Sequence, residues 1–406
     1  MNINHNIVQK EVTSSMRVAN PYTTGAGNMP DYLAGRENTL KAAKQILQAE
    51  SMGYPQQPVI YYGLRGVGKT VLLNAVEESI ETLPIAFEHM EVSEENGDFL
   101  TKITGACTTI MHTLSLSNAA KEFIASAVNL LRALLISWNP EEKTVSVDLS
   151  GEIPPVTGNL SSDLTDLFVQ LGKIAKKSNM AICFFIDEVQ YLSSKEAEAL
   201  INALHRVNQL RYPVIVFGAG LPKVLKEFEE AKSYSERLFQ FIEIDKLDDH
   251  AAREAICIPA ERQNVAYSQQ AVEEILRITE GYPYFIQELC SAAWNATTGD
   301  RIEEEDIARA AEKFYQKMDQ GFFKSRFDRC SKREQEFIFA MVRCGELPCT
   351  IANVAAHMNL SAKKVATYRA QLINKGIIYA TGYGEVDFTV PQFDAYLKRI
   401  APERTR

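Results

Sequence analysis

The chain has 406 residues and a formal net charge of −9 at pH 7, and 46% of its residues are hydrophobic. This length suffices for two or three domains with separate cores. The sequence contains no apolar run long enough to span a membrane, and its polar start lacks the apolar stretch of a secretion signal, so we expect a cytoplasmic protein.

The first elements in chain order predict an extended arm followed by an α/β domain. Residues 1–30 contain Pro21, Gly25, Gly27 and Pro30 and show no apolar periodicity. Residues 31–246 then alternate short β-type runs with helical segments. The expected strands are 59–62, 84–87, 180–186, 214–218 and 239–244, and the expected helices are 38–48, 70–80, 100–114, 164–176 and 195–210. This alternation predicts a parallel sheet with helices on both faces.

The first strand leads into a glycine-rich segment with the pattern G-x-x-x-x-G-K-T. The residues of this phosphate loop are Gly63, Leu64, Arg65, Gly66, Val67, Gly68, Lys69 and Thr70, followed by Val71 in the next helix. Glycines let successive N–H groups turn inward, and the start of a helix attracts anions. We therefore predict an ATP site in which Lys69 neutralises β- and γ-phosphate oxygens and the Thr70 hydroxyl holds Mg²⁺.

The strand expected at 180–186 ends in two carboxylates, Asp187 and Glu188. Parallel strands of one sheet end at the same edge, so this pair should lie near Thr70. Phosphoryl transfer needs a metal holder and a base that orients the attacking water. We assign the first role to Asp187, as a second Mg²⁺ ligand, and the second role to Glu188.

Two further regions precede the C-terminus. Residues 138–160 are rich in proline and glycine and are expected to form a short hairpin or an insertion without an assigned function. Residues 247–321 read as a helical lid subdomain, with Ser268 as an N-cap and Gly281 closing the helix that follows it.

The last domain, residues 322–402, has the element order of a winged helix-turn-helix: three helices and then a hairpin around Tyr383. Residues 322–406 carry 14 Lys and Arg against 8 Asp and Glu, a net charge of +6, which leaves −15 for the rest. The third helix, 361–375, is expected to turn Val365, Ala366, Leu372 and Ile373 toward the core. Its candidate DNA contacts are Lys363, Lys364, Tyr368, Arg369 and Lys375. A protein partner for the same basic face is the alternative.

These motifs, in this order, resemble those of AAA+ ATPases: LAGRE at 33–37, the phosphate loop, FFIDEVQYL at 184–192, VFGAGLP at 216–222, SYSERLF at 233–239 and GYPYFIQ at 281–287. The resemblance is greatest to the prokaryotic ATPases akin to origin-recognition initiators, with features of STAND signalling NTPases. It implies that the segment ending at Gly35 and Arg36 packs against adenine. It also implies that Arg237 is an arginine finger for a neighbouring subunit's ATP, although pairing with Glu236 or capping of a helix is an equal alternative.

Two departures from the family pattern predict slow hydrolysis. The strand at 214–218 ends in Gly218-Ala219-Gly220 where the family has a polar sensor residue, and Gly281-Tyr282-Pro283 stands where initiators have a sensor arginine. STAND-type proteins use such a G-x-P beside the nucleotide, so Pro283 is also a candidate nucleotide contact.

The expected fold class is thus an α/β P-loop NTPase with a helical lid and a C-terminal winged helix. The expected function is that of an ATPase that binds ATP and Mg²⁺ and couples its nucleotide state to homo-oligomer assembly and to double-stranded DNA. The alternative is a STAND-like regulatory switch, in signalling or phage defence, whose tail docks a protein. The seven cysteines lack a C-x-x-C pair, so we expect reduced thiols and no metal ion besides Mg²⁺.

Overall fold

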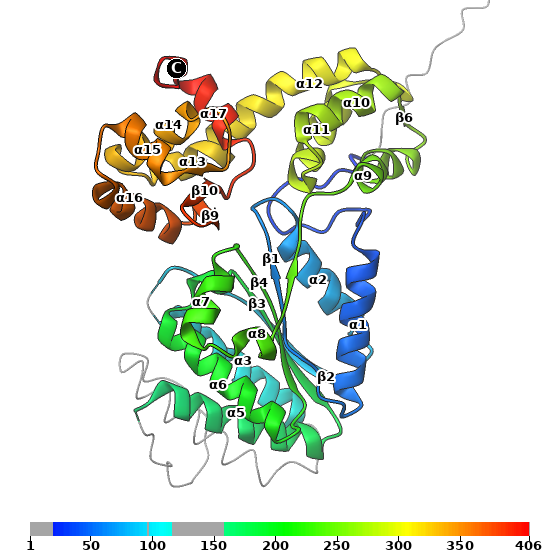
Figure 1. The fold of residues 1–406 in the computed structure, drawn as a ribbon. Helices are drawn as coiled ribbons and strands as arrows, with labels where there is room; N and C mark the ends of the chain where they lie inside the picture. The colour runs from blue at the N-terminus through cyan, green and yellow to red at the C-terminus, as the bar shows by residue number, and fades with distance from the viewer. Residues whose placement is uncertain (1–18, 96, 116–157, 406) are drawn as a thin grey trace, which may run out of the picture. The chain divides into compact units, whose positions relative to one another are not determined.

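The computed structural model describes residues 19–95, 97–115 and 158–405 (Figure 1). The chain forms two compact units, which we call the helical unit and the sheet unit. The helical unit contains residues 19–35 together with Lys246–Phe322, and the sheet unit contains the described residues of Arg36–Asp245 and of Phe323–Arg406. The first 18 residues of the predicted arm, and all but 158–160 of the predicted insertion, lie outside the described residues.

The sheet unit begins with the predicted alternation of strands and helices. Its strands are β1 (Val59–Tyr62), β2 (Ile85–Glu91), β3 (Ala181–Asp187), β4 (Val214–Gly220) and β5 (Gln240–Glu243). Its helices in this region are α1 (Glu37–Ser51), α2 (Lys69–Ser79), α3 (Asp98–Ser115), α5 (Leu160–Lys177), α6 (Ser194–Gln209), α7 (Val224–Ala231) and α8 (Ser235–Leu238). The strands pair in parallel, as the sequence predicts. Their order in the sheet is β2-β3-β4-β1-β5.

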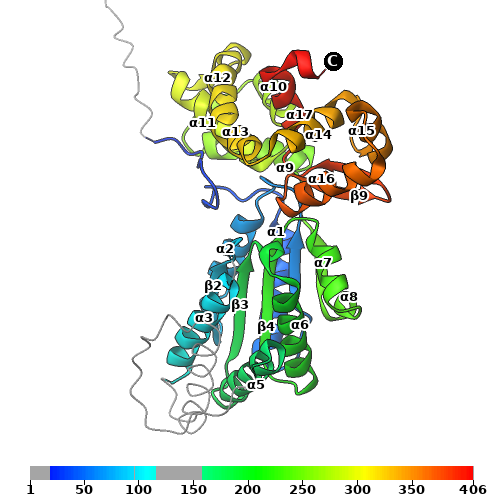
Figure 2. The same ribbon diagram turned by 90° about the vertical axis from the view of Figure 1, so that its left-hand side faces the viewer.

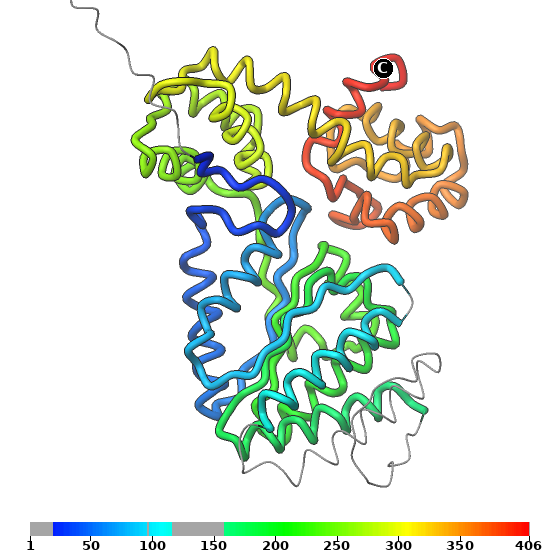
Figure 3. The backbone as a smooth tube through the Cα atoms, turned by 180° about the vertical axis from the view of Figure 1, so that it is seen from behind, coloured from blue at the N-terminus to red at the C-terminus, as the bar shows by residue number. Residues whose placement is uncertain are grey.

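Every residue of β3 is buried, because helices cover both faces of the sheet. Alternate residues Ile182, Phe184 and Ile186 pack in one core with α3, α5 and α6. The two ribbon views place α6 on one face of the sheet and α1 on the other (Figures 1 and 2). The view from behind shows the blue helices α1 and α2 on one side of the strands and the green helices on the other (Figure 3). Since the strands are parallel, the carboxyl ends of β1, β3 and β4 meet at one edge.

The C-terminal part of the sheet unit contains the three expected helices and the hairpin in the predicted order, with one further helix before them and one after them. Its elements are α13 (Lys324–Asp328), α14 (Lys332–Arg343), β8 (Cys349–Thr350), α15 (Ile351–Met358), α16 (Ala362–Asn374), β9 (Ile378–Gly382), β10 (Glu385–Phe388) and α17 (Phe393–Ile400). The strands form an antiparallel sheet in the order β8-β10-β9. Gly376 follows α16 with φ 62°, a conformation that favours glycine after a helix.

The helical unit consists of α9 (Asp249–Glu261), β6 (Ala266–Tyr267), α10 (Gln269–Thr279), α11 (Pro283–Ala296), β7 (Arg301–Ile302) and α12 (Glu304–Lys317). Ser268 caps α10 as expected, since its hydroxyl accepts from the Ala271 N–H at 3.2 Å. The described part of the arm packs on these helices, where the Tyr22 hydroxyl donates to the Ile256 carbonyl at 2.5 Å and the Asn20 amide donates to the Ser291 hydroxyl at 2.9 Å.

Two further expectations concern the chain as a whole. The seven cysteines are free thiols, five of them buried. No helix in the described parts of the chain combines the length and the apolar character that crossing a bilayer requires.

Candidate nucleotide site

The predicted phosphate loop connects β1 to α2 at the carboxyl edge of the sheet. Gly66 and Gly68 have φ angles of 82° and 88°, in the left-handed region that glycine adopts at little cost. Gly63 is buried so closely that a Cβ there would lie 2.1 Å from the Ile244 carbonyl oxygen. Lys69 is the first residue of α2, with Thr70 and Val71 in the same first turn. The N–H groups of this turn lack helical acceptors, which makes it suited to an anion.

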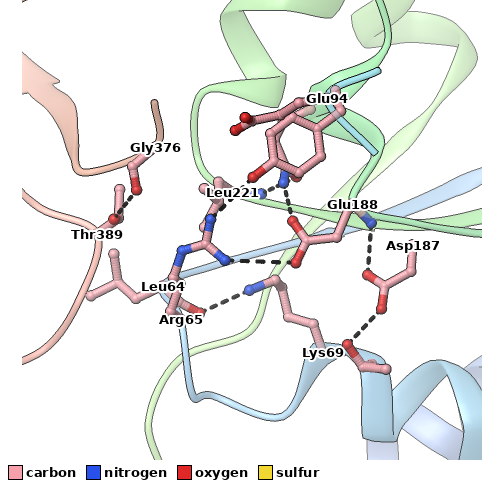
Figure 4. A network of polar contacts seen from close by, with 12 residues as sticks. Leu64, Arg65, Lys69, Glu94, Asp187, Glu188, Leu221, Gly376 and Thr389 are labelled. Carbon is pink, nitrogen blue, oxygen red and sulfur yellow. Dashed lines mark hydrogen bonds and ion pairs between the residues drawn. The ribbon is translucent and has the colours of Figure 1, made fainter. Parts of the chain in front are cut away.

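The Lys69 ammonium is held inside the loop. It donates to the Gly63 carbonyl oxygen at 3.0 Å. It also donates to the Leu64 carbonyl oxygen at 2.8 Å (Figure 4). Burial lowers the pKa of Lys69 to about 8, and the neighbouring carboxylates Glu188 and Asp187 oppose this shift. A triphosphate would offer this ammonium charged acceptors in place of neutral carbonyls.

Thr70 and Asp187 meet at the same place, as the sequence predicts. The Thr70 hydroxyl donates to Asp187 Oδ2 at 2.5 Å, and Asp187 Oδ1 accepts from the Glu188 N–H at 2.8 Å. Burial raises the pKa of Asp187, and the Thr70 hydrogen bond opposes the shift. A hydroxyl and a carboxylate oxygen side by side are ligands that Mg²⁺ prefers, so these two residues fit the metal of a nucleotide complex.

Glu188 follows β3 with a left-handed backbone, φ 55°. Its carboxylate has two partners: the Arg65 guanidinium lies 3.7 Å from one oxygen, and the Gln190 side-chain amide donates to the other (Figure 4). The left-handed backbone conformation of Glu188 is uncommon for residues other than glycine and is frequent at functional sites. The acidic tip of β3 thus faces the phosphate loop.

Arg65 also contacts residues from later in the sheet unit. Its guanidinium donates to the Tyr191 hydroxyl at 3.4 Å, and its main-chain N–H donates to the Thr389 carbonyl at 3.0 Å. Figure 4 shows Thr389 beside Gly376, whose carbonyl accepts from the Thr389 hydroxyl at 2.6 Å. Nearby, the Arg329 guanidinium donates to both oxygens of Glu94, at 2.6 and 2.8 Å. The loop that would hold phosphate is therefore in contact with C-terminal residues.

The remaining predicted nucleotide residues lie in different places. Arg36 is the N-cap residue of α1, and its guanidinium donates to the carbonyls of Val67 and Asp245, at 3.2 and 2.5 Å. It thus supports the back of the phosphate loop. Gly35, with φ 65°, and Pro283, the first residue of α11, belong to the helical unit.

Arg237 lies in the short helix α8 and its side chain is exposed. The main-chain carbonyl of Arg237 accepts from the Gln57 side chain at 2.8 Å. Among the described residues its guanidinium forms no ion pair with Glu236.

The candidate DNA residues of α16 divide into two groups. Lys363 and Lys364 are exposed, and Tyr368 and Arg369 are half-buried. Lys375 instead has structural partners: its ammonium lies 2.7 Å from the buried Glu334 carboxylate and 3.0 Å from the Arg329 carbonyl.

The predicted core face of α16 was wrong at one position. Val365 and Leu372 are buried and Ile373 is half-buried, but Ala366 is exposed, because it lies beyond the edge of the narrow apolar stripe that packs against α14, α15 and β9.

Three residues of this network were not predicted from the sequence: Gln190, Tyr191 and Leu221. Their position in the sequence could have indicated their place in it. Gln190 and Tyr191 come shortly after Glu188 at the end of β3, and Leu221 comes directly after the glycines at the end of β4. Residues that directly follow the carboxyl ends of neighbouring parallel strands lie at the same edge of the sheet.

Comparisons with known proteins agree with this geometry. Residues 32–217 match the family described as AAA ATPase domain, and residues 320–397 match a family described only as a domain of unknown function. None of the curated proteins matches the chain significantly. Among solved structures, the Walker-type ATPase PABY2304 of Pyrococcus abyssi is similar in fold, with 12% identity, a TM-score of 0.56, and coverage of 91% of this chain and 96% of that one.

Two other structures are less similar. The Aeropyrum pernix Orc1 protein in complex with DNA has 15% identity and a TM-score of 0.43, over 91% of this chain and 94% of that one. The Thermotoga maritima RuvB Holliday junction branch migration motor has 16% identity and a TM-score of 0.42, over 90% and 95%. At these scores neither likeness adds to the assignment. The family match and the loop geometry together identify residues 32–217 as an AAA ATPase domain with a phosphate loop.

Proposed function

We propose that this ATPase couples its nucleotide state to self-assembly and to the binding of duplex DNA. The observation that carries the DNA part is the exposed pair Lys363 and Lys364 on α16, within a C-terminal region of net charge +6. Lysines without acidic neighbours on one helix suit phosphate contacts in the major groove. Tyr383 is fully exposed at the tip of the hairpin and would contact the backbone of the duplex.

In the ATP site, we assign one role to each of the residues described above. Lys69 binds the β- and γ-phosphates, the loop from Gly63 to Thr70 surrounds them, and Thr70 and Asp187 hold Mg²⁺. Glu188 is the base that orients water. Replacing Glu188 by Gln should preserve ATP binding and lower turnover by about 10²- to 10⁴-fold. Full activity of that variant would remove Glu188 from this role.

Assembly is assigned to Arg237. An exposed guanidinium in α8 is available to a second subunit, where it would stabilise charge on the transferred phosphate and raise turnover by about 10³-fold or more. Arg237→Ala and Lys69→Ala proteins should each be inactive and should recover activity when mixed, because each supplies what the other lacks. A mixture as inactive as its components would exclude a shared site.

The DNA part is tested by reversing two charges on α16. The Lys363→Glu, Lys364→Glu protein should bind duplex DNA more weakly, and the slope of log affinity against log salt should fall by about two units. The matched control is Lys41→Glu, Lys44→Glu, which changes two exposed lysines on α1. Fluorescence anisotropy across a salt series measures both. Equal affinities for the two variants would refute a DNA role for α16.

A STAND-like switch with a protein partner is the second candidate. Two observations favour it: the sequence Gly281-Tyr282-Pro283 at the start of α11, and the main-chain hydrogen bond from Arg65 in the phosphate loop to Thr389. In such a switch, nucleotide exchange would change the C-terminal contact directly. Mass measured in solution separates the candidates: ATP-driven assembly that duplex DNA enhances supports the first, and a monomer indifferent to DNA supports the second.

A further inference from the structure

Gln190 links the acidic tip of β3 to the end of β4. Its side chain is only 2% exposed, and both ends of its amide are used. The carbonyl oxygen accepts from the Leu221 main-chain N–H at 2.9 Å, and the amide nitrogen donates to the Glu188 carboxylate (Figure 4). This orientation of the amide is the one that chemistry requires, because a main-chain N–H needs an acceptor and a carboxylate needs a donor.

The two glycines at the end of β4 make room for this link. A Cβ at Gly220 would lie 2.8 Å from the side-chain oxygen Oε1 of Gln190 and 2.8 Å from one methyl group of Val189. A Cβ at Gly218 would lie 3.0 Å from the other methyl group of Val189. A larger residue at either position would displace the turn that carries Gln190. Gly218 and Gly220, which stand where the family has a polar sensor residue, therefore leave the space that the Gln190 side chain needs. Gln190, in the turn after β3, can then hydrogen-bond to the residue that follows β4.

Glu188 needs such support. Its left-handed backbone is unfavourable for a residue with a Cβ, so neighbouring contacts must hold it in place. Gln190 binds one carboxylate oxygen and Arg65 lies near the other, at 3.7 Å. A base must be held within about 0.5 Å of its productive position to be efficient.

We propose that Gln190 is a positioning residue for ATP hydrolysis, which holds the Glu188 carboxylate and connects it to β4 in place of a polar residue on that strand. This inference rests on the proposed role of Glu188 as the base. It predicts that Gln190 affects turnover through Glu188 and leaves ATP binding unchanged.

Two substitutions separate positioning from a purely structural role. Gln190→Glu keeps an acceptor for the Leu221 N–H but replaces the donor to Glu188 by a second carboxylate. Gln190→Met removes both hydrogen bonds. If Gln190 positions Glu188, both variants should lose about 10- to 100-fold in kcat, while the affinity for a fluorescent ATP analogue stays within about twofold of wild type. Gln209→Glu, an exposed site on α6, is the control that should change neither.

A double-mutant cycle completes the test. In a protein that already carries Glu188→Gln, adding Gln190→Met should cost nothing more in single-turnover rate, because Gln190 acts through the missing carboxylate. Wild-type kcat in Gln190→Glu, or losses that multiply in the double variant, would overturn the inference. Should Gln190→Met fail to fold, Gln190→Glu alone decides, since it keeps the contact with Leu221. Full activity of Glu188→Gln by itself would instead show that the proposed base is wrong, and the inference would fail with it.

Discussion

Glu50, near the end of α1, is a carboxylate buried in the sheet unit that takes no part in the candidate site. It is 2% exposed, and its Oε2 accepts from the Gln56 N–H at 2.7 Å. Burial raises the pKa of Glu50 from 4.5 to about 7, against the opposing effect of that hydrogen bond. Replacing Glu50 by Gln removes the ionisable group and leaves an oxygen to accept from Gln56.

The size and sign of the effect follow from this shift. Below pH 4.5 the group is protonated in both the folded and the unfolded chain, so the fold pays no cost for it. As pH rises from 4.5 to about 7, the unfolded chain ionises while the folded chain keeps the proton, and stability falls with pH. At pH 8 the loss reaches about 3 kcal/mol, since one pKa unit is worth about 1.4 kcal/mol.

We therefore expect Glu50→Gln to raise the free energy of unfolding of the sheet unit by about 1 to 3 kcal/mol at pH 8 and by almost nothing at pH 4.5. The expected gain can be as small as about 1 kcal/mol, because the buried amide group that this substitution introduces needs hydrogen-bond partners of its own. Thermal unfolding followed by circular dichroism between pH 4.5 and 8 measures the difference, with exposed Glu78→Gln on α2 as the control. A gain that is the same at both ends of the pH range, or a loss at pH 8, would refute the reasoning.

Three further changes have defined outcomes. Gly63→Ala places a methyl group 2.1 Å from the Ile244 carbonyl oxygen, so the protein should lose about 3 kcal/mol or more of stability and fail to bind ATP, as thermal shift with and without nucleotide would show. Lys375→Met leaves the buried Glu334 carboxylate without its ion pair and should lower stability by about 1 to 2 kcal/mol, whereas exposed Lys363→Met should not; equal melting temperatures would contradict this. Thr70→Ala should weaken Mg²⁺-dependent ATP binding about tenfold or more and leave Mg²⁺-free binding nearly unchanged, which calorimetry with and without EDTA tests.

The sheet and its phosphate loop could be predicted because their signals are local. A buried parallel strand such as β3 is a continuous apolar run, and the glycine pattern from Gly63 to Thr70 fixes a loop and a helix start together. The juxtaposition of Thr70 and Asp187 then follows from the rule that parallel strands end at one edge. All five strands begin and end within a few residues of their predicted bounds, so apolar periodicity and turn residues suffice to locate the strands of such a domain.

The rest of the site depends on contacts between residues far apart in sequence. Lys375 read as a DNA contact because its charge is visible in the sequence, whereas its partner Glu334 lies 41 residues away on α14. The glycines of β4 read as a missing sensor, because nothing in the sequence shows that Gln190 occupies the space they leave. Tertiary packing decides both cases, and single-sequence patterns do not contain it.

Arg65 contacts both the candidate catalytic base and the C-terminal region, so it bears on both functional hypotheses. Its side chain contacts the candidate base Glu188 and the Tyr191 hydroxyl, and its main chain donates to Thr389 in the C-terminal part of the same unit. A phosphate loop that changes conformation around a triphosphate must move this residue, and with it contacts on both sides. Under either hypothesis, the C-terminal region would thus respond to the nucleotide through Arg65, whether its own ligand is DNA or a protein. What separates the hypotheses is therefore the chemistry of the exposed face of α16, and the charge reversal at Lys363 and Lys364 tests that face without touching Arg65.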